Sequence, residues 1–242
     1  SNSGQQLKAE FAVAKWPLAD LAIRFGMSSE RFEGLPANVV VSFDVSNAAG
    51  VEQIIIDVDA GTGRLPIGSD GLGVESLKLR AAYAASTDTL SIDASTAGAG
   101  PLKGNAVLTV QDAMKGETFR KFSLVSSELE LDLTPRLERP VPISRLNLSG
   151  EVDLATYAFR GAEMSLRTGD DTLNASGTFQ FTPDRKPGEP PILGSIDFAS
   201  EGDLSRDTVL AFWPVKLGEG ARRFTVNRVT SGVITSAEGH ID

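Results

Sequence analysis

Apolar residues recur at every second position along most of this 242-residue chain. Val39, Val41 and Phe43, for example, alternate with positions that include Ser42 and Asp44. A period of two gives a strand one apolar and one polar face, which is typical of antiparallel sheets with one solvated side. Short turns separate the runs, and consecutive strands joined by short turns form a meander. The sequence therefore predicts a mainly β fold, an extended curved antiparallel meander sheet forming an open groove, with two or three short helices.

Three segments show helical spacing instead. We expect short helices near 17–26, 205–213 and 219–228, with Ser205 as the N-cap of the second and Pro214 following its end.

The chain length fits one large domain or two small ones, and we expect a single elongated β domain over 7–242. Residues 1–6 are polar and are interpreted as a cloning scar or linker. The segment 183–191 holds four prolines and is interpreted as an exposed loop. The start without Met and the end in mid-pattern indicate a piece of a longer protein, which would carry any membrane anchor elsewhere.

A weak internal repeat supports a sheet that grows along one axis. The tripeptide Asp-Thr-Leu opens a predicted strand twice, at 88–90 and 171–173, in hairpins that also contain Tyr83 and Tyr157.

Composition excludes several classes of function. The chain has 23 Lys and Arg against 32 Asp and Glu, a net charge of −9, which disfavours nucleic-acid binding. It has no cysteine, which excludes disulfides, thiolate catalysis and iron–sulfur clusters, and its one histidine is His240. We therefore expect no enzyme, no cofactor and no metal.

The carboxylates are best explained as a solvated outer face. Asp57 and Asp59 share one face of a predicted strand, and Asp170 precedes Asp171 in a turn. A glycosidase pair and a calcium site stay open as alternatives. They are the weaker interpretations, because the sequence shows neither a cleft nor the residue spacing of a calcium-binding loop.

The apolar face itself is the main candidate for function. The predicted helices are too few to cover a dozen strands, so the sheet either closes on its own side chains or leaves a trough. An uncovered trough would bind acyl chains, since each buried methylene contributes roughly 0.8 kcal/mol. The predicted lipid-groove residues are Val39, Val41, Phe43, Ile54, Ile56, Val58, Leu77, Leu79, Leu146, Leu148, Phe179 and Phe181.

Two adjacent arginines, Arg222 and Arg223, lie beside Phe224 in the last predicted helix. They are interpreted either as a helix end paired with carboxylates or as contacts for a lipid headgroup.

Residues 205–238 resemble a motif of AsmA-like proteins of the YhdP-type subgroup. In that motif a Trp-Pro pair, a Gly-x-x-Ala-Arg-Arg-Trp run and a Gly-x-(Val/Ile)-x-x-Ala run link one repeat to the next. This chain has Trp213-Pro214, Ala221-Arg222-Arg223 with Phe224 in place of Trp, and Gly232-Val233-Ile234.

The resemblance implies an internal periplasmic piece of a large Gram-negative envelope protein anchored in the inner membrane. Such proteins form a groove-shaped β-sheet and are implicated in phospholipid movement toward the outer membrane and in envelope integrity. The implied partners are phospholipid acyl chains and neighbouring repeats of the full-length protein, with membrane contact through segments outside this chain.

A second hypothesis is a carbohydrate-binding or adhesin-like β-sandwich. It predicts exposed aromatic residues that line a cleft, and beyond Phe the chain offers Trp16, Trp213, Tyr83 and Tyr157.

Overall fold

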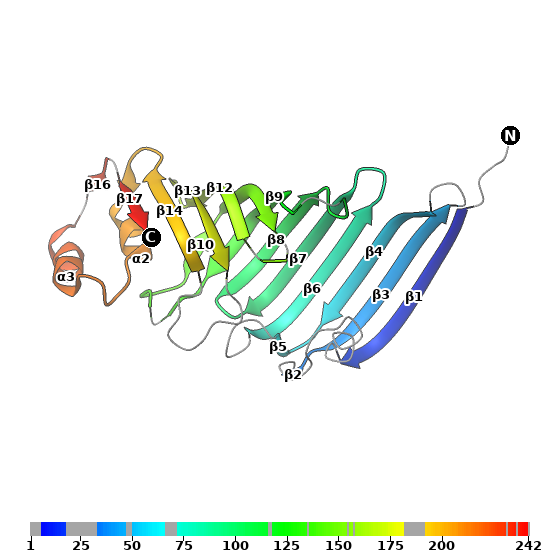
Figure 1. Cartoon of the computed structure of the whole chain (residues 1–242). Coiled ribbons are helices and arrows are strands. Elements are labelled where there is room, and N and C mark those ends of the chain that lie inside the picture. Colours follow the sequence, from blue (N-terminus) through cyan, green and yellow to red (C-terminus); the bar gives the residue numbers. More distant parts are fainter. Residues whose placement is uncertain are drawn as a thin grey trace.

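The computed structural model describes residues 6–17, 33–46, 50–65, 72–115, 118–134, 136–153, 155–156, 158–181, 192–230, 232–235 and 237–241. Within these ranges the protein is a wide antiparallel sheet with a small helical segment at its C-terminal end (Figure 1). The predicted fold class is confirmed, because the sheet is mainly a meander and is open rather than closed.

The large sheet holds 15 strands in the part of the chain that is described. Twelve of them lie side by side in the order β1 (Gln6–Pro17), β3 (Pro36–Ser46), β4 (Gly50–Ala60), β6 (Leu72–Ala84), β7 (Thr89–Ala99), β8 (Leu102–Gln111), β9 (Arg120–Leu131), β11 (Arg145–Asp153), β12 (Ala158–Thr168), β13 (Asp171–Phe181), β14 (Ile192–Ser200) and β17 (Glu238–Ile241). The short strands β2 (Glu33–Gly34), β5 (Gly63–Leu65) and β10 (Val141–Ile143) pair at the margins, and β15 (Leu204–Ser205) pairs with β16 (Val233–Ile234) in a separate small sheet.

Two of the expected helices are present. Helix α2 spans Arg206–Phe212, and Ser205 caps it by accepting the backbone N–H of Thr208. Helix α3 spans Glu219–Arg228.

The helix expected near 17–26 does not begin at Pro17, because Pro17 is the last residue of β1. The rest of that segment lies outside the described residues. The expected proline-rich loop at 183–191 also lies outside them.

The first strand, β1, was not expected from the sequence. Its residues alternate, but Ala, Glu and Lys are common in it, and these residue types favour helices. Pairing with β3 overrides that preference: Leu7 lies opposite Val45, and Phe11 lies opposite Val41. The linker boundary also moves, because Gln6 belongs to β1.

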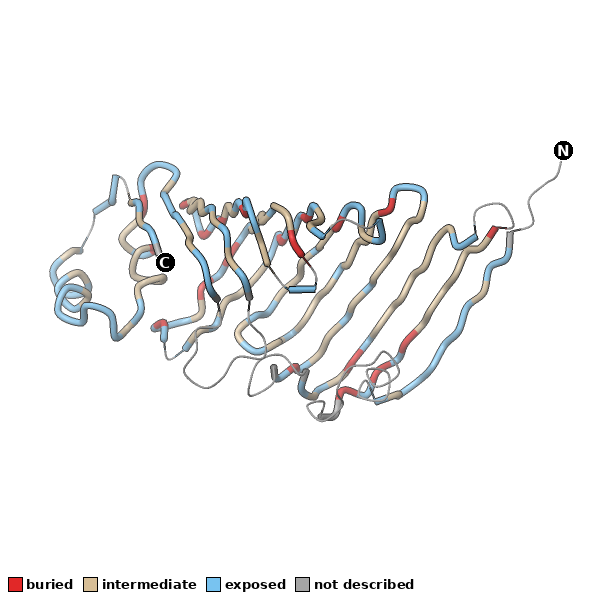
Figure 2. The backbone as a smooth tube through the Cα atoms, in the orientation of Figure 1, coloured by how far each residue is buried: buried red, intermediate tan, exposed pale blue. Residues whose placement is uncertain are grey.

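Two clusters of buried hydrophobic residues lie near the ends of strands in the described part of the sheet (Figure 2). One cluster is Leu35, Ala37, Val39, Ala60 and Val74, and the other is Val110, Phe122 and Val152. Between them the strands carry half-buried residues, so the middle of the sheet is not covered as a closed core would be.

Candidate functional site

The strand register places the predicted groove residues of the N-terminal strands on one face of the sheet. Residues directly opposite each other in an antiparallel pair share a face. Val39 lies opposite Val58, and Val58 lies opposite Leu79. The remaining pairs of this region are Val41 with Ile56, Phe43 with Ile54, and Ala60 with Leu77.

The same face continues through the middle strands. Leu79 lies opposite Ala94 of β7. Ile92, two positions away on β7, shares this face and lies opposite Leu108 of β8, which in turn lies opposite Leu124 of β9. Leu124 lies opposite Leu148 of β11, one of the predicted residues. Leu146, two positions away on β11, therefore shares this face and lies opposite Leu166.

The face reaches the C-terminal strands through aromatic residues. Val152 of β11 lies opposite Phe159, and Phe159 lies opposite the predicted residue Phe179. The rings of Phe159 and Phe179 stack at 4.8 Å, and the ring of Phe122 meets Phe159 edge-on at 5.4 Å. Phe181 lies opposite Ile192 in the register between β13 and β14.

We call this face the apolar wall. It consists of eleven of the twelve predicted residues, since the side chain of Phe181 lies outside the described part of the structure, together with Leu7, Phe11, Val13, Ile92, Leu108, Leu124, Phe159 and Leu166. Sequence reasoning missed the residues on β1, although the alternation of Leu7, Ala9, Phe11 and Val13 was visible.

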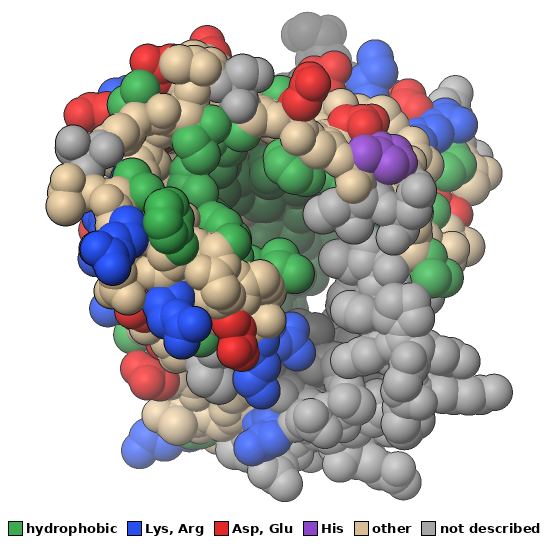
Figure 3. All heavy atoms as spheres, turned by 90° about the vertical axis from the view of Figure 1, so that its left-hand side faces the viewer, with side chains coloured by type: hydrophobic (Ala, Val, Ile, Leu, Met, Phe, Trp, Pro, Cys, Tyr) green, Lys and Arg blue, Asp and Glu red, His purple; other side chains and the backbone are tan. Residues whose placement is uncertain are grey.

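The apolar wall lines a hollow. Viewed from the C-terminal end, hydrophobic side chains line a deep recess with polar side chains along its left and upper margins (Figure 3). Most wall residues are half-buried, and on β1 Leu7 and Phe11 are 65% and 62% exposed. Exposed apolar surfaces of this extent are typical of interaction sites.

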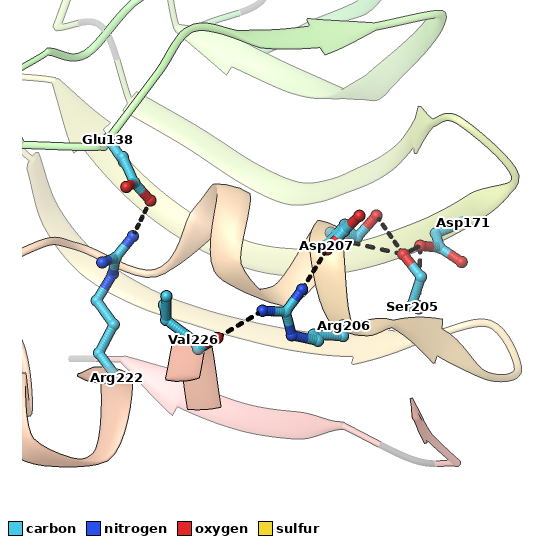
Figure 4. Close-up of polar contacts among 8 residues, drawn as sticks. Glu138, Asp171, Ser205, Arg206, Asp207, Arg222 and Val226 are labelled. Carbon is cyan, nitrogen blue, oxygen red and sulfur yellow. Dashed lines mark hydrogen bonds and ion pairs between the residues drawn. The ribbon is translucent and has the colours of Figure 1, made fainter. Parts of the chain in front are cut away.

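At the C-terminal end, the two candidate headgroup residues have different surroundings, and Figure 4 shows Arg222 directed toward Glu138. Arg222 is mostly buried, and its guanidinium donates to Glu138 at 2.6 Å. A headgroup at Arg222 would therefore compete with Glu138. Arg223, the next residue of α3, is exposed.

The same segment is tied to the sheet by further polar contacts. Arg206 donates to the carbonyl of Val226 at 3.0 Å, which links α2 to α3. The Ser205 hydroxyl donates to the carboxylate of Asp171 at 2.6 Å, and its backbone N–H donates to the same carboxylate at 3.1 Å. These bonds, led by the Ser205 hydroxyl, hold the pKa of Asp171 below its ordinary value.

The aspartate of the other Asp-Thr-Leu tripeptide, at 88–90, is also held by hydrogen bonds from a later segment of the chain. Asp88 is buried and accepts the Tyr83 hydroxyl at 2.9 Å and the backbone N–H groups of Met114 and Lys115. Burial alone would raise the pKa of Asp88, but the hydrogen bonds outweigh it and the net shift is downward. In both repeats the aspartate therefore fastens a hairpin turn to a segment that follows later in the chain.

The opposite face of the sheet is polar. Asp57, one of the paired carboxylates, receives both of its contacts from Arg80 at 2.9 Å. A shallow depression of about 810 Å³ crosses β11–β14 on this side, with Asn147, Glu163 and Asp197 among its lining residues.

The aromatic residues of the carbohydrate hypothesis do not gather at this depression. Trp16 lies on β1 and Trp213 follows α2, at opposite ends of the sheet (Figure 1). Tyr83 is bonded to Asp88, the Trp213 indole donates to the carbonyl of Leu217 at 2.6 Å, and Tyr157 lies outside the described residues.

No protein-family model matches the chain, and no curated protein or solved structure matches it. Among the described residues, no helix is long and apolar enough to cross a membrane.

Proposed function

We propose that this chain is a non-enzymatic segment of a periplasmic, AsmA-like bridge protein that supports phospholipid movement between the inner and outer membranes and envelope integrity. In this proposal the acyl chains lie along the apolar wall, and the full-length protein is anchored in the inner membrane by a segment outside this chain.

The observation that carries the proposal is the continuity of the apolar wall from strand to strand. Val39, Ile56 and Leu79 at one end and Phe179 at the other share a face of one sheet. Each methylene that a lipid tail buries there contributes roughly 0.8 kcal/mol, so a tail binds without any directional contact. A surface without directional contacts also lets the tail change position along it at little cost.

A headgroup contact is proposed at Arg223. This residue is exposed on α3, at the end of the sheet where the recess opens in Figure 3. A guanidinium binds phosphate oxygens in a bidentate geometry, which suits a phospholipid headgroup.

The residues of the Trp213-Pro214 and Ala221-Arg222-Arg223 motif support the family assignment. Trp213-Pro214 follow α2 and Ala221-Arg222-Arg223 lie in the first half of α3, and both helices follow the last long strand of the sheet, β14. A linking position of this kind is what the AsmA-like resemblance implies for the motif.

The proposal is tested by placing a photo-crosslinking amino acid on the apolar wall. Neighbouring residues of one strand point to opposite faces, so Ile56 and Asp57 on β4 form a matched pair. We expect the probe at Ile56 to capture phospholipid in Gram-negative cells and the probe at Asp57 to capture none. Equal capture at both positions, or none at Ile56 together with glycan binding in a screen, would contradict the proposal.

A charge on the apolar wall gives a second test. Ile56→Glu places a carboxylate among the acyl chains, and we expect about tenfold less co-purified phospholipid by native mass spectrometry. Val40→Glu is the matched control, because Val40 lies opposite Asp57 on the polar face and is also half-buried. Equal lipid content in the two variants would place the lipid elsewhere.

A further inference from the structure

The depression of about 810 Å³ on the polar face of the sheet has the size of a small-molecule site. Its floor is continuous sheet, because β11, β12, β13 and β14 each pair with the next. Neighbouring residues of a strand point to opposite faces, so Met164, Ala175 and Phe198 present only backbone here and turn their side chains to the apolar wall. The residues before and after them direct their side chains into the depression.

Those side chains form two rows that cross the strands. The first polar row is Asn147, Ser165 and Asn174, and the second polar row is Ser149, Glu163, Ser176 and Asp197. Within each row, every residue lies directly opposite the next one in the strand register. Neighbouring strands are about 4.8 Å apart, so the second polar row extends over roughly 14 Å. Amide, hydroxyl and carboxylate groups therefore recur at regular intervals and do not converge on one point.

Most of these groups are available to a ligand. Among the described residues, the side chains of Asn147, Asn174 and Glu163 form no hydrogen bond or ion pair with the protein. Asp197, at the end of the second polar row, contacts His240 at 2.7 Å. An amide both donates and accepts hydrogen bonds, whereas a carboxylate only accepts them. The depression therefore offers donors and acceptors side by side along its length.

The charges at the depression argue against two other kinds of ligand. Among the described residues, no Lys or Arg lines it, whereas Glu163, Asp197 and Glu238 do, so an anion such as a phosphate group is disfavoured. In the same part of the chain, no group of three or more carboxylate or imidazole side chains could hold a metal ion. The ligand that matches these groups is neutral and carries hydroxyl groups spaced along its length.

We propose that the depression binds a neutral, hydroxyl-rich oligosaccharide that lies across β11–β14. The sugar hydroxyls donate to the carboxylates of Glu163 and Asp197, and they exchange hydrogen bonds in both directions with the amides of Asn147 and Asn174. Because the ring of Phe198 points to the other face, the site recognises the sugar by hydrogen bonds and not by ring stacking, and we expect a Kd of about 1 mM. The proposed lipid function uses the apolar wall, so the two ligands occupy opposite faces of one sheet.

The side-chain amides of the first polar row report binding directly. We expect the NMR signals of the Asn147 and Asn174 amide groups to shift in a saturable way when cellohexaose, chitohexaose or maltohexaose is added. The amide of Asn105 on β8 is the internal control, because it lies on the same face but outside the depression. Its signal should not move.

Matched variants test whether these residues carry the affinity. Asn174→Ala removes an amide that donates and accepts, and we expect sugar binding about tenfold weaker. Asn105→Ala makes the same chemical change outside the depression and should alter the Kd by less than about twofold. Glu163→Gln keeps an acceptor but removes a charge, so it should preserve binding of a neutral sugar. Thermal melting checks that each variant is folded.

The proposal is overturned if none of the three hexasaccharides shifts the Asn147 and Asn174 signals up to about 10 mM, or if Asn105→Ala weakens binding as much as Asn174→Ala. A response to calcium chloride alone that is lost in Glu163→Gln would assign the depression to a cation and would also overturn it. Lipid capture at Ile56 is read on the opposite face, so the sugar site and the proposed lipid function can fail separately.

Discussion

The N-terminal half of the sheet, β1–β7, and the C-terminal half, β8–β14, form one apolar wall but build it differently. In the N-terminal half, branched residues face each other, as Val39 does with Val58. In the C-terminal half, glycines take wall positions: Gly177 lies opposite Ala162, and Gly194 lies opposite Phe179.

Those glycines allow strands to approach closely. A Cβ at Gly177 would lie 2.3 Å from the backbone oxygen of Ser195, and one at Gly194 would lie 2.2 Å from that of Thr178. Glycine inside a strand marks a bend or close backbone contact. In Figure 1 the C-terminal strands are turned relative to the N-terminal ones, and Figure 3 shows the recess from that end. Branched side chains therefore suffice for the open part of the wall, while its curled part needs glycine.

Acid should destabilise the C-terminal half more than the N-terminal half, and this difference should be the largest of the effects compared. Asp88, Asp132, Asp153 and Asp171 each have a pKa below the ordinary value of 3.8. The last three lie in the C-terminal half, and Asp88, in the turn between β6 and β7, accepts two backbone N–H groups of the segment that follows β8. Because the folded pKa values are lower, their stabilisation is complete above the unfolded value and is lost as the pH falls through the folded values.

As the pH falls through and below the ordinary value of 3.8, we therefore expect amide protection factors, which correct for the slower intrinsic exchange in acid, to fall in β9, β11 and β13 before they fall in β3 and β4. Four carboxylates act together, so this effect should exceed the loss of any one. Repeating the titration at high salt screens general charge repulsion but does not restore these hydrogen bonds. Earlier opening of β3 and β4 would contradict the comparison.

The sequence was sufficient for the parts of the fold that local pattern determines. The period of two placed residues such as Val41 and Leu148 on one face, and the cap at Ser205 located α2. The pattern found the repeated Asp-Thr-Leu tripeptide but not its role, because the two backbone N–H groups that Asp88 accepts lie 26 and 27 residues away.

The partner of Arg222 was hidden for the same reason. Glu138 is 84 residues away in the chain, and no local pattern connects the two. The close approach at Gly177 likewise depends on how β13 and β14 are placed, since the contacting oxygen belongs to Ser195. Contacts of this kind follow from the curvature of the whole sheet, which alternation alone does not fix.

Filling a wall glycine should have the next largest effect. Gly177→Val puts a branched side chain against the backbone of β14, and we expect a loss of about 3 kcal/mol in the free energy of unfolding by urea. The matched control is Gly73→Val in the N-terminal half, where a Cβ meets nothing within 4 Å and the change should stay within about 0.5 kcal/mol. Equal stability of the two variants would show that the curled half tolerates side chains as the open half does.

The smallest of these effects should come from the link between the curled half and the helical segment. Asp171→Ala removes the acceptor for the Ser205 backbone N–H and hydroxyl, and a hydrogen bond to a charged group contributes about 2 kcal/mol. We expect roughly 30-fold faster hydrogen exchange in α2, with β3 and β4 unchanged. Asp170→Ala is the matched control, because the neighbouring Asp170 side chain is fully exposed and only a 3.8 Å contact with Arg167 is lost. If the amides of α2 exchange as slowly in Asp171→Ala as in the original chain, the contact between Asp171 and Ser205 does not hold the helical segment on the sheet. Other contacts, such as Arg222 with Glu138, then hold it.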